Sequence, residues 1–240
     1  LDASYQLDAN NSIGANFGFL RNPKQTWNGD MSSSILQDGD LSESSDSHAD
    51  FFWQKNNLSS NIYYVGKIGK LSIDFNTDWL WSKEYQNDVT KEQYQEVGMN
   101  AQSQTAHSLT NKDYHLLASK LVLSYPLSGG NLSLGGEYSN THRTSKYQVV
   151  PTNLVADDDS RITESMTSSF LTYSRDFGNL SLEAGMGYEY IDFNYYEYGK
   201  YVPGQSKSYG NWFPSISLSM PVGKVQMQLS YAADINRPSY

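Results

Sequence analysis

Few side chains in this sequence could carry catalysis or bind a metal, and those few lack the necessary spacing. The chain has four histidines, His48, His107, His115 and His142, and no cysteine. It contains no HExxH pair, no nucleophile elbow, no phosphate-binding loop and no dinucleotide-binding glycine motif. We therefore predict no catalytic residue, no metal site and no cofactor, and we expect that the protein is not an enzyme.

Two acidic runs are candidates for calcium binding by composition alone. They are Asp38-Gly39-Asp40 with Glu43, Asp46 and Asp50, and Asp157-Asp158-Asp159. An EF-hand loop needs a glycine at its sixth position and a glutamate at its twelfth, and neither run has that spacing. We interpret both runs as solvated acidic loops.

Aromatic side chains in polar segments are the remaining candidates for ligand contact. Trp27, Tyr94, Tyr198 and Tyr201 lie in stretches rich in polar residues, away from the apolar patterns described below. Aromatic rings stack on sugars and pack against chelates, and they also pack loops together. We take these four residues as the candidate ligand-binding residues.

The stretch from Asn179 to Tyr190 shows which elements would position those loops. Leucine, alanine, methionine and tyrosine at its even positions alternate with serine, glutamate and glycine at its odd positions. A period of two predicts a strand with one apolar and one polar face. About eleven residues, tilted by about 45°, span about 25 Å, which is the height of a membrane strand. Glu183 and Glu189 would then point into a lumen.

The same pattern recurs in three other stretches that open with glycine and end with an aromatic residue. They are Gly69–Trp79, Gly130–Tyr138 and Gly223–Tyr231. Glycine followed by lysine or asparagine is typical of tight turns between strands. Four copies predict a meander of long hairpins, with about ten antiparallel strands in all.

Four polar segments interrupt the alternation, and we expect them to be loops. They cover about residues 21–50, 86–110 (where a short helix is an alternative), 148–161 and 198–210. Phe170-Leu171 breaks the alternation within another strand and predicts a β-bulge. Short turns at one end and long loops at the other are typical of outer-membrane barrels.

Composition limits the classes of function. The net charge is −9, which argues against nucleic-acid binding because phosphate-binding proteins need a basic face. Mean hydropathy is −0.60, and no run of about eighteen apolar residues occurs, so no transmembrane helix is predicted. A barrel remains compatible with this composition, since only alternate residues of its strands face lipid.

The parity of the turns predicts that the chain is one part of a larger barrel. If the short turns are periplasmic, the first predicted strand begins at the outer rim and the last one ends there, whereas a complete barrel normally begins and ends in the periplasm. We therefore expect residues 1–240 to be a single β-barrel segment, with the plug domain and the remaining strands absent. The two edge strands of the isolated segment would lack partners, which favours self-association.

The final motif points to a family. Tyr231–Tyr240, ending in Asn236-Arg237-Pro238-Ser239-Tyr240, resembles a strand end found in TonB-dependent outer-membrane receptors of the Bacteroidetes type, and Gly66–Asn76 is similar to the same barrels. In such receptors a plug domain sits inside a barrel of roughly 22 strands. The resemblance implies an all-β chain in the bacterial outer membrane, in contact with lipid.

The leading hypothesis is a barrel segment of a TonB-dependent receptor that takes up a nutrient through outer loops and a plugged lumen. The resemblance implies periplasmic TonB as a partner, through the absent plug region, and an unknown nutrient ligand such as a glycan or a metal chelate. Two alternatives stay open. One is a complete ten-stranded outer-membrane barrel with hydrolase activity in its loops, and the other is a soluble, glycan-binding β-sandwich.

Overall fold

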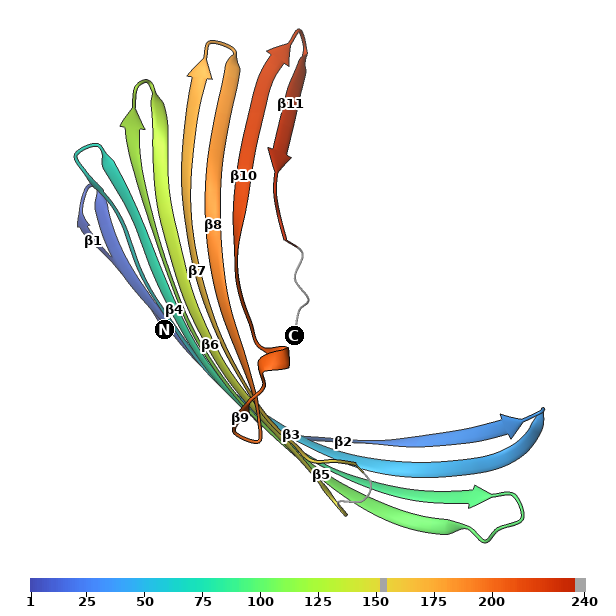
Figure 1. Ribbon diagram of the computed structural model, residues 1–240. Coiled ribbons are helices and arrows are strands. Elements are labelled where there is room, and N and C mark those ends of the chain that lie inside the picture. Colours follow the sequence, from blue (N-terminus) through green and yellow to red (C-terminus); the bar gives the residue numbers. More distant parts are fainter. Residues whose placement is uncertain (152–154, 236–240) are drawn as a thin grey trace.

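The strands of the chain follow one another along a single antiparallel sheet, as the computed structural model shows (Figure 1). The structure describes residues 1–151 and 155–235, so the motif at 236–240 lies outside the described residues. The elements are β1 (Asp2–Asp8), β2 (Asn11–Gln37), β3 (Asp40–Ile68), β4 (Leu71–Glu96), β5 (Gln102–Leu127), β6 (Gly130–Val150), β7 (Asp158–Phe177), β8 (Leu180–Glu197), β9 (Lys200–Tyr201), the 3₁₀ turn η1 (Pro203–Gln205), β10 (Lys207–Val222) and β11 (Val225–Ala232).

The meander topology confirms the predicted fold class. The strands pair in the order β1-β2-β3-β4-β5-β6-β7-β8-β10-β11, and the two-residue strand β9 pairs with β8. The short turns are where the glycines predicted them. Gly69 has a φ of 60° at the first central position of its turn, and Ser128-Gly129 has φ values of 52° and 78°. These left-handed values match the primed turns whose twist fits a hairpin.

The predicted long loops are wrong, because most of their residues continue the strands. Residues 21–50 belong to β2 and β3, which meet at the tight turn Asp38-Gly39. Residues 86–110 extend β4 and β5, and no helix forms there. Residues 148–161 and 198–210 are strand in part. The error has a physical cause: these extensions are polar on both faces, so they lack the alternation by which a half-buried strand is recognised.

The hairpins are staggered in the manner of a tilted barrel. Ser72 pairs with Ser124, and Gly130 pairs with Arg175, so each short turn extends about two residues beyond its neighbour. Two residues are about 6.6 Å along a strand, and two strand spacings are about 9.6 Å across the sheet. The ratio corresponds to a tilt of about 35°, within the range found in membrane barrels.

The register gives the sheet two unlike faces near its short turns. On one face, which we call the apolar face, paired residues form the row Tyr5, Ile13, Tyr64, Phe75, Leu121, Gly136, Ser169, Tyr188 and Trp212. On the opposite face, the polar face, the neighbouring row is Gly14, Tyr63, Asn76, Lys120, Glu137, Ser168, Glu189 and Asn211. Glu183 and Glu189 both lie on the polar face, as their alternation predicted. The two names apply along the whole length of the strands.

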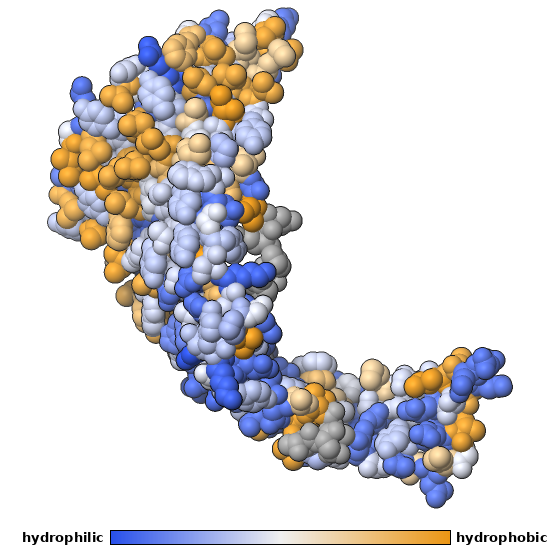
Figure 2. All heavy atoms as spheres, in the orientation of Figure 1, coloured by the Kyte–Doolittle hydropathy of each residue, from blue (hydrophilic) through white to orange (hydrophobic). Residues whose placement is uncertain are grey.

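The apolar face carries a band of membrane height. In β4 its apolar residues run from Leu71 to Trp81, and aromatic residues close the band in other strands, among them Phe19, Tyr190 and Trp212. Ten residues at a tilt of about 35° rise about 27 Å. In Figure 2 hydrophobic residues gather at the end of the molecule that holds the short turns, while the middle of the sheet is hydrophilic.

Almost no hydrophobic residue is buried within the described part of the chain. Only Val149 and Ile191 are buried, whereas Leu121, Leu171 and Leu229 are 41%, 48% and 73% exposed. A soluble β-sandwich would bury its apolar faces between two sheets. The sandwich alternative is therefore wrong, because here one sheet leaves its apolar face without a second layer. None of the described helical turns is long and apolar enough to cross a membrane.

No bulge occurs at Phe170-Leu171, contrary to the sequence-based expectation. The pairing of β7 with β6 and β8 runs through both residues without a shift. Leu171 lies on the apolar face, and Phe170 lies on the polar face opposite Gly135. A Cβ atom at Gly135 would lie 2.2 Å from the Phe170 ring, so the ring occupies the space above the glycine. The aromatic residue interrupts the polar alternation because it fills this gap.

Both edges of the sheet are open among the described strands. β1 pairs only with β2, and β11 pairs only with β10. The pairing of β2 with β1 ends near Asn16 and Phe17, so the rest of β2 has a partner on one side only. A complete ten-stranded barrel would need β1 to pair with the last strand, and the described residues make no such pairing.

Candidate functional site

A bulge in β2 brings Trp27 to the polar face. Asn22 pairs with Lys55 and Gln25 pairs with Trp53, so β2 holds one extra residue at Pro23-Lys24. Before the bulge, odd residues of β2 lie on the apolar face, and after it they lie on the polar face. Trp27 therefore stacks on Phe51, with ring centroids 3.9 Å apart. Together with Trp53 these rings form an aromatic surface beyond the apolar band.

Tyr94 lies on the same polar face, farther from the short turns. It is on the polar face of β4, and its hydroxyl donates to Gln102 Oε1 at 2.7 Å. Two residues earlier, Glu92 accepts hydrogen bonds from Ser45 and from Gln104. The Ser45 hydroxyl, followed by the Gln104 amide, lowers the pKa of Glu92. This part of the polar face is hydrophilic, and its side chains form hydrogen bonds with one another.

Tyr198 and Tyr201 form a separate group at the β8–β9 turn. The Tyr198 hydroxyl donates to the carbonyl oxygen of Asp157, and its backbone N–H donates to Asp159 at 2.7 Å. The Tyr201 ring meets Tyr196 edge-on, with centroids 5.5 Å apart. The structure therefore places the four predicted aromatic residues at three sites: Trp27 on the β2–β3 hairpin, Tyr94 on the β4–β5 hairpin, and Tyr198 and Tyr201 together at the β8–β9 turn.

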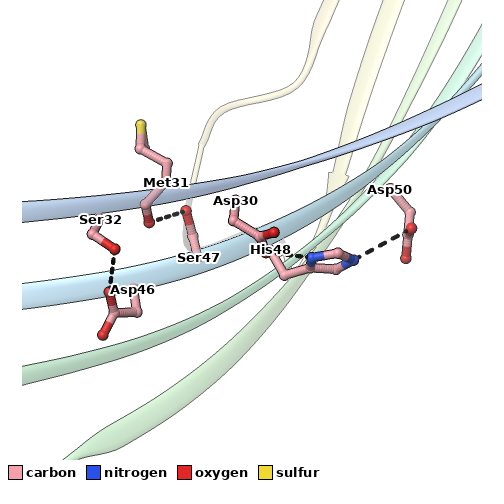
Figure 3. A network of polar contacts seen from close by, with 7 residues as sticks. All are labelled: Asp30, Met31, Ser32, Asp46, Ser47, His48 and Asp50. Carbon is pink, nitrogen blue, oxygen red and sulfur yellow. Dashed lines mark hydrogen bonds and ion pairs between the residues drawn. The ribbon is translucent and has the colours of Figure 1, made fainter.

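A histidine between two carboxylates lies on the apolar face of β3, beyond the apolar band (Figure 3). His48 Nδ1 is 2.6 Å from Asp30 Oδ1, and Nε2 is 3.6 Å from Asp50 Oδ1. The neighbouring Ser32 hydroxyl donates to Asp46, and Ser47 bonds to the Met31 carbonyl. Because both imidazole nitrogens face carboxylates, this cluster does not present a base to a serine nucleophile.

The two acidic runs make structural contacts. Asp38-Gly39 forms the β2–β3 turn. Asp157 Oδ1 accepts the Val149 N–H at 3.0 Å, and Asp159 pairs with Lys146 at 3.0 Å. In the described ranges no group of three or more metal-binding side chains converges.

We predict that replacing Asp30 lowers the pKa of His48. The hydrogen bond that the His48 imidazole donates to Asp30 raises that pKa above its ordinary value, aided by the charges of Asp30 and Asp50. Lys91, which pairs with His48 across the β3–β4 ladder, is the opposing charge. A raised pKa means that His48 contributes stability below about pH 6.5 and that the contribution disappears as pH rises through the folded-state pKa. NMR titration of the imidazole in Asp30→Asn should give a lower pKa than in the parent protein.

Asp46→Asn is the matched control for this prediction. Asp46 lies on the same face of β3, but it bonds to Ser32 instead of His48. Its replacement should leave the His48 titration close to that of the parent. An unchanged pKa in Asp30→Asn would contradict the pairing.

A comparison with protein-family models shows the family of the chain. Residues 66–240, well over half of the chain, match the model of the outer membrane protein beta-barrel family. The chain belongs to the outer membrane protein beta-barrel family. Its apolar face is thus the lipid-facing surface of a β-barrel in the bacterial outer membrane, and its polar face lines the lumen.

Solved structures with a similar fold include outer-membrane receptors. The alcaligin outer membrane receptor FauA from Bordetella pertussis is 13% identical with a TM-score of 0.40, and the alignment covers 92% of this chain and 43% of that one. The unliganded ferric citrate transporter FecA is 11% identical with a TM-score of 0.43, over 93% and 42% of the two chains. This barrel chain thus spans less than half the length of either protein. The search of curated proteins returned no match.

Proposed function

We propose that the chain forms one stretch of the barrel wall of a TonB-dependent receptor and that residues 1–240 are a single barrel segment. The plug domain and the remaining strands would be supplied outside this chain. The observation that carries the proposal is the change along the sheet: an apolar band of about 27 Å, then long strands that are polar on both faces. The final sequence motif further supports a receptor of the Bacteroidetes type.

The orientation follows from the turns. Outer-membrane barrels keep short turns in the periplasm and extend toward the outside. The hairpins β2–β3 and β4–β5 continue past the ends of the other strands in Figure 1, so they would form a wall around the outer mouth. A nutrient such as a glycan or a metal chelate would meet Trp27 and Tyr94 on this wall, and Tyr198 and Tyr201 at the β8–β9 turn.

The partners follow from this role. Lipid surrounds the apolar face, and periplasmic TonB would act through a plug region outside residues 1–240. The protein would move a ligand and would not catalyse a reaction. The open edges at β1 and β11 support a place within a larger barrel. We also expect the isolated segment to self-associate through these edges, which light scattering in detergent would detect as a mass above 27.0 kDa.

Uptake by cells that contain the natural protein tests the proposal. Accumulation of a radiolabelled ferric hydroxamate, a ferric catecholate and maltoheptaose would be compared in the parent strain, a strain lacking this protein and a strain lacking TonB. At least one probe should accumulate only when both proteins are present. Equal accumulation in the three strains for every probe would refute a TonB-dependent receptor.

A further inference from the structure

Three neighbouring strands carry an ion-paired cluster on the polar face. Lys55, Glu84 and Lys112 stand in one register row across β3, β4 and β5. Lys55 Nζ is 3.8 Å from Glu84 Oε2, and Lys112 Nζ is 3.5 Å from Glu84 Oε1. The Glu84 side chain is only 19% exposed, so a single shielded carboxylate serves two ammonium groups.

Arg143 adds a third cation from the next strand. It lies on the polar face of β6 and pairs with Tyr114, which is two residues from Lys112 on β5. Arg143 is half-buried, and no described residue forms an ion pair or hydrogen bond with its guanidinium. A cavity of about 330 Å³ is lined by Lys55, Ser82, Glu84, Lys112, Tyr114 and Arg143, among others.

The charge of this cavity is opposite to that of the chain. On the polar face, three cations and the Glu84 carboxylate leave a local charge of about +2, whereas the whole chain carries −9. Asp113 also borders the cavity, but its position on β5 belongs to the apolar face, where its carboxylate is 2.8 Å from His115 Nε2. A guanidinium has five N–H donors and is costly to shield from water without an acceptor. An anion bound in the cavity would complete the hydrogen bonding of the Arg143 guanidinium.

The position of the cavity suits a ligand that arrives from outside. Lys55 and Glu84 lie about thirteen residues from their short turn, which is a rise of about 35 Å. The apolar band ends at about 27 Å, so the cavity opens on the lumen just beyond the membrane. Lys55 and Arg143 are three strand spacings apart, about 14 Å at the backbone, so a single compact anion cannot contact every cation.

We propose that the cavity lined by Lys55, Lys112 and Arg143 binds a small oligocarboxylate anion in the lumen. One carboxylate meets the planar fork of Arg143, and another meets the ammonium of Lys112. The hydroxyl group of Tyr114 supplies a further donor. The proposal rests on the proposed function in one respect, since it treats the polar face as the wall of a ligand passage.

Calorimetric titration of the natural protein in detergent at low ionic strength tests the site. Citrate is the oligocarboxylate probe, inorganic phosphate is the compact anion and maltotriose is the neutral probe. Citrate should bind, and Arg143→Gln or Lys112→Gln should weaken its binding about 10- to 100-fold, as expected for loss of a charge-assisted contact. Phosphate should bind at least about tenfold more weakly than citrate, since it reaches fewer cations.

Lys83→Gln is the matched control. Lys83 precedes Glu84 on β4 and points to the opposite face, so its replacement removes the same charge outside the lumen. Citrate affinity in Lys83→Gln should stay within about twofold of the parent. Heat-shifted gel mobility would verify that every variant is folded.

Glu84→Gln separates a binding role from a structural role. If the cluster only held the strands together, this change would weaken the fold and would not improve binding. If the cavity binds an anion, removing its one carboxylate should tighten citrate binding several-fold, because both lysines are freed and a repulsion disappears. Absence of citrate binding, equal affinity in all variants, or phosphate binding as tight as citrate would overturn the proposal.

Failure of this inference and failure of the receptor proposal give different results. Citrate binding that depends on Arg143, with uptake that does not need TonB, would leave the site standing and refute the receptor. TonB-dependent uptake of a neutral probe, without citrate binding, would support the receptor and refute the site.

Discussion

Leu121→Arg is expected to destabilise the folded barrel by about 2–4 kcal/mol, the cost of an arginine near the midplane on a lipid-facing strand position. Leu121 lies on the apolar face of β5, between Phe75 on β4 and Gly136 on β6. It stands about six residues from the short turn, which is a rise of about 16 Å in a band of about 27 Å. A guanidinium at this depth cannot reach water without thinning the bilayer.

Ala118→Arg controls for the charge and for the strand. Ala118 is three residues away on β5 but faces the lumen, where it pairs with Asp78 and Ser139. An arginine there lies near a carboxylate and near water, so its effect should stay within about 1 kcal/mol. Urea titration of folding into lipid vesicles, followed by tryptophan fluorescence, would measure both variants. Equal loss of stability in the two would contradict the assignment of the faces.

Gly135→Val is expected to cost about 1–3 kcal/mol through overpacking of the lumen wall. The first atom of any side chain at Gly135 would lie 2.2 Å from the Phe170 ring, a distance that two carbon atoms cannot adopt. The Phe170 ring would have to leave its place over the β6 backbone. The Phe170 backbone cannot move with it, because the pairing of β7 with β6 holds that backbone in register. Folding in vesicles would report the loss as a lower urea midpoint with a similar slope.

The adjacent glycine provides a control with the opposite expectation. Gly136 lies on the apolar face, and a Cβ atom there meets only the Ser168 carbonyl oxygen at 3.5 Å, an ordinary contact. Gly136→Val adds an apolar, β-branched side chain toward lipid, so it should be neutral or stabilising by about 0.5–1 kcal/mol. A cost for Gly136→Val as large as that for Gly135→Val would show that the Phe170 contact is not the cause.

The positions of the candidate binding residues depend on the apolar band and on the polar strand extensions. The apolar band determines where the strands cross the membrane, and the polar extensions carry the aromatic rings and the charged side chains beyond it. The cation cluster at Lys55, Lys112 and Arg143 adds a reason for selectivity, because an oligocarboxylate would gain contacts that a neutral sugar lacks. The aromatic surface around Trp27 would then contact the less polar part of a ligand.

Local pattern alone was sufficient for the strands that cross the membrane. Alternation from Asn179 to Tyr190, and its copies elsewhere, predicted the two faces and the meander, because each such strand has lipid on one side and polar surroundings on the other. Glycine followed by lysine or asparagine marked the short turns, since left-handed φ values favour glycine. The net charge of −9 argued against nucleic-acid binding, and a sequence without cysteine offers no thiolate ligand.

Only the tertiary structure decided the outer half of the sheet. Both faces of its strands are polar, so no hydrophobic period distinguishes residues 21–50 or 86–110 from loops. These residues are strands because their backbones pair with segments that are distant in the sequence. The bulge at Pro23-Lys24 reverses the alternation of β2 and turns Trp27 toward the lumen. Lys55, Lys112 and Arg143 are far apart in the sequence, and they line one cavity because register across four strands places them on the same face. The alternation of apolar and polar residues within one strand is visible in the sequence. The register between strands is not, because it is set by the pairing of residues that are distant in the sequence.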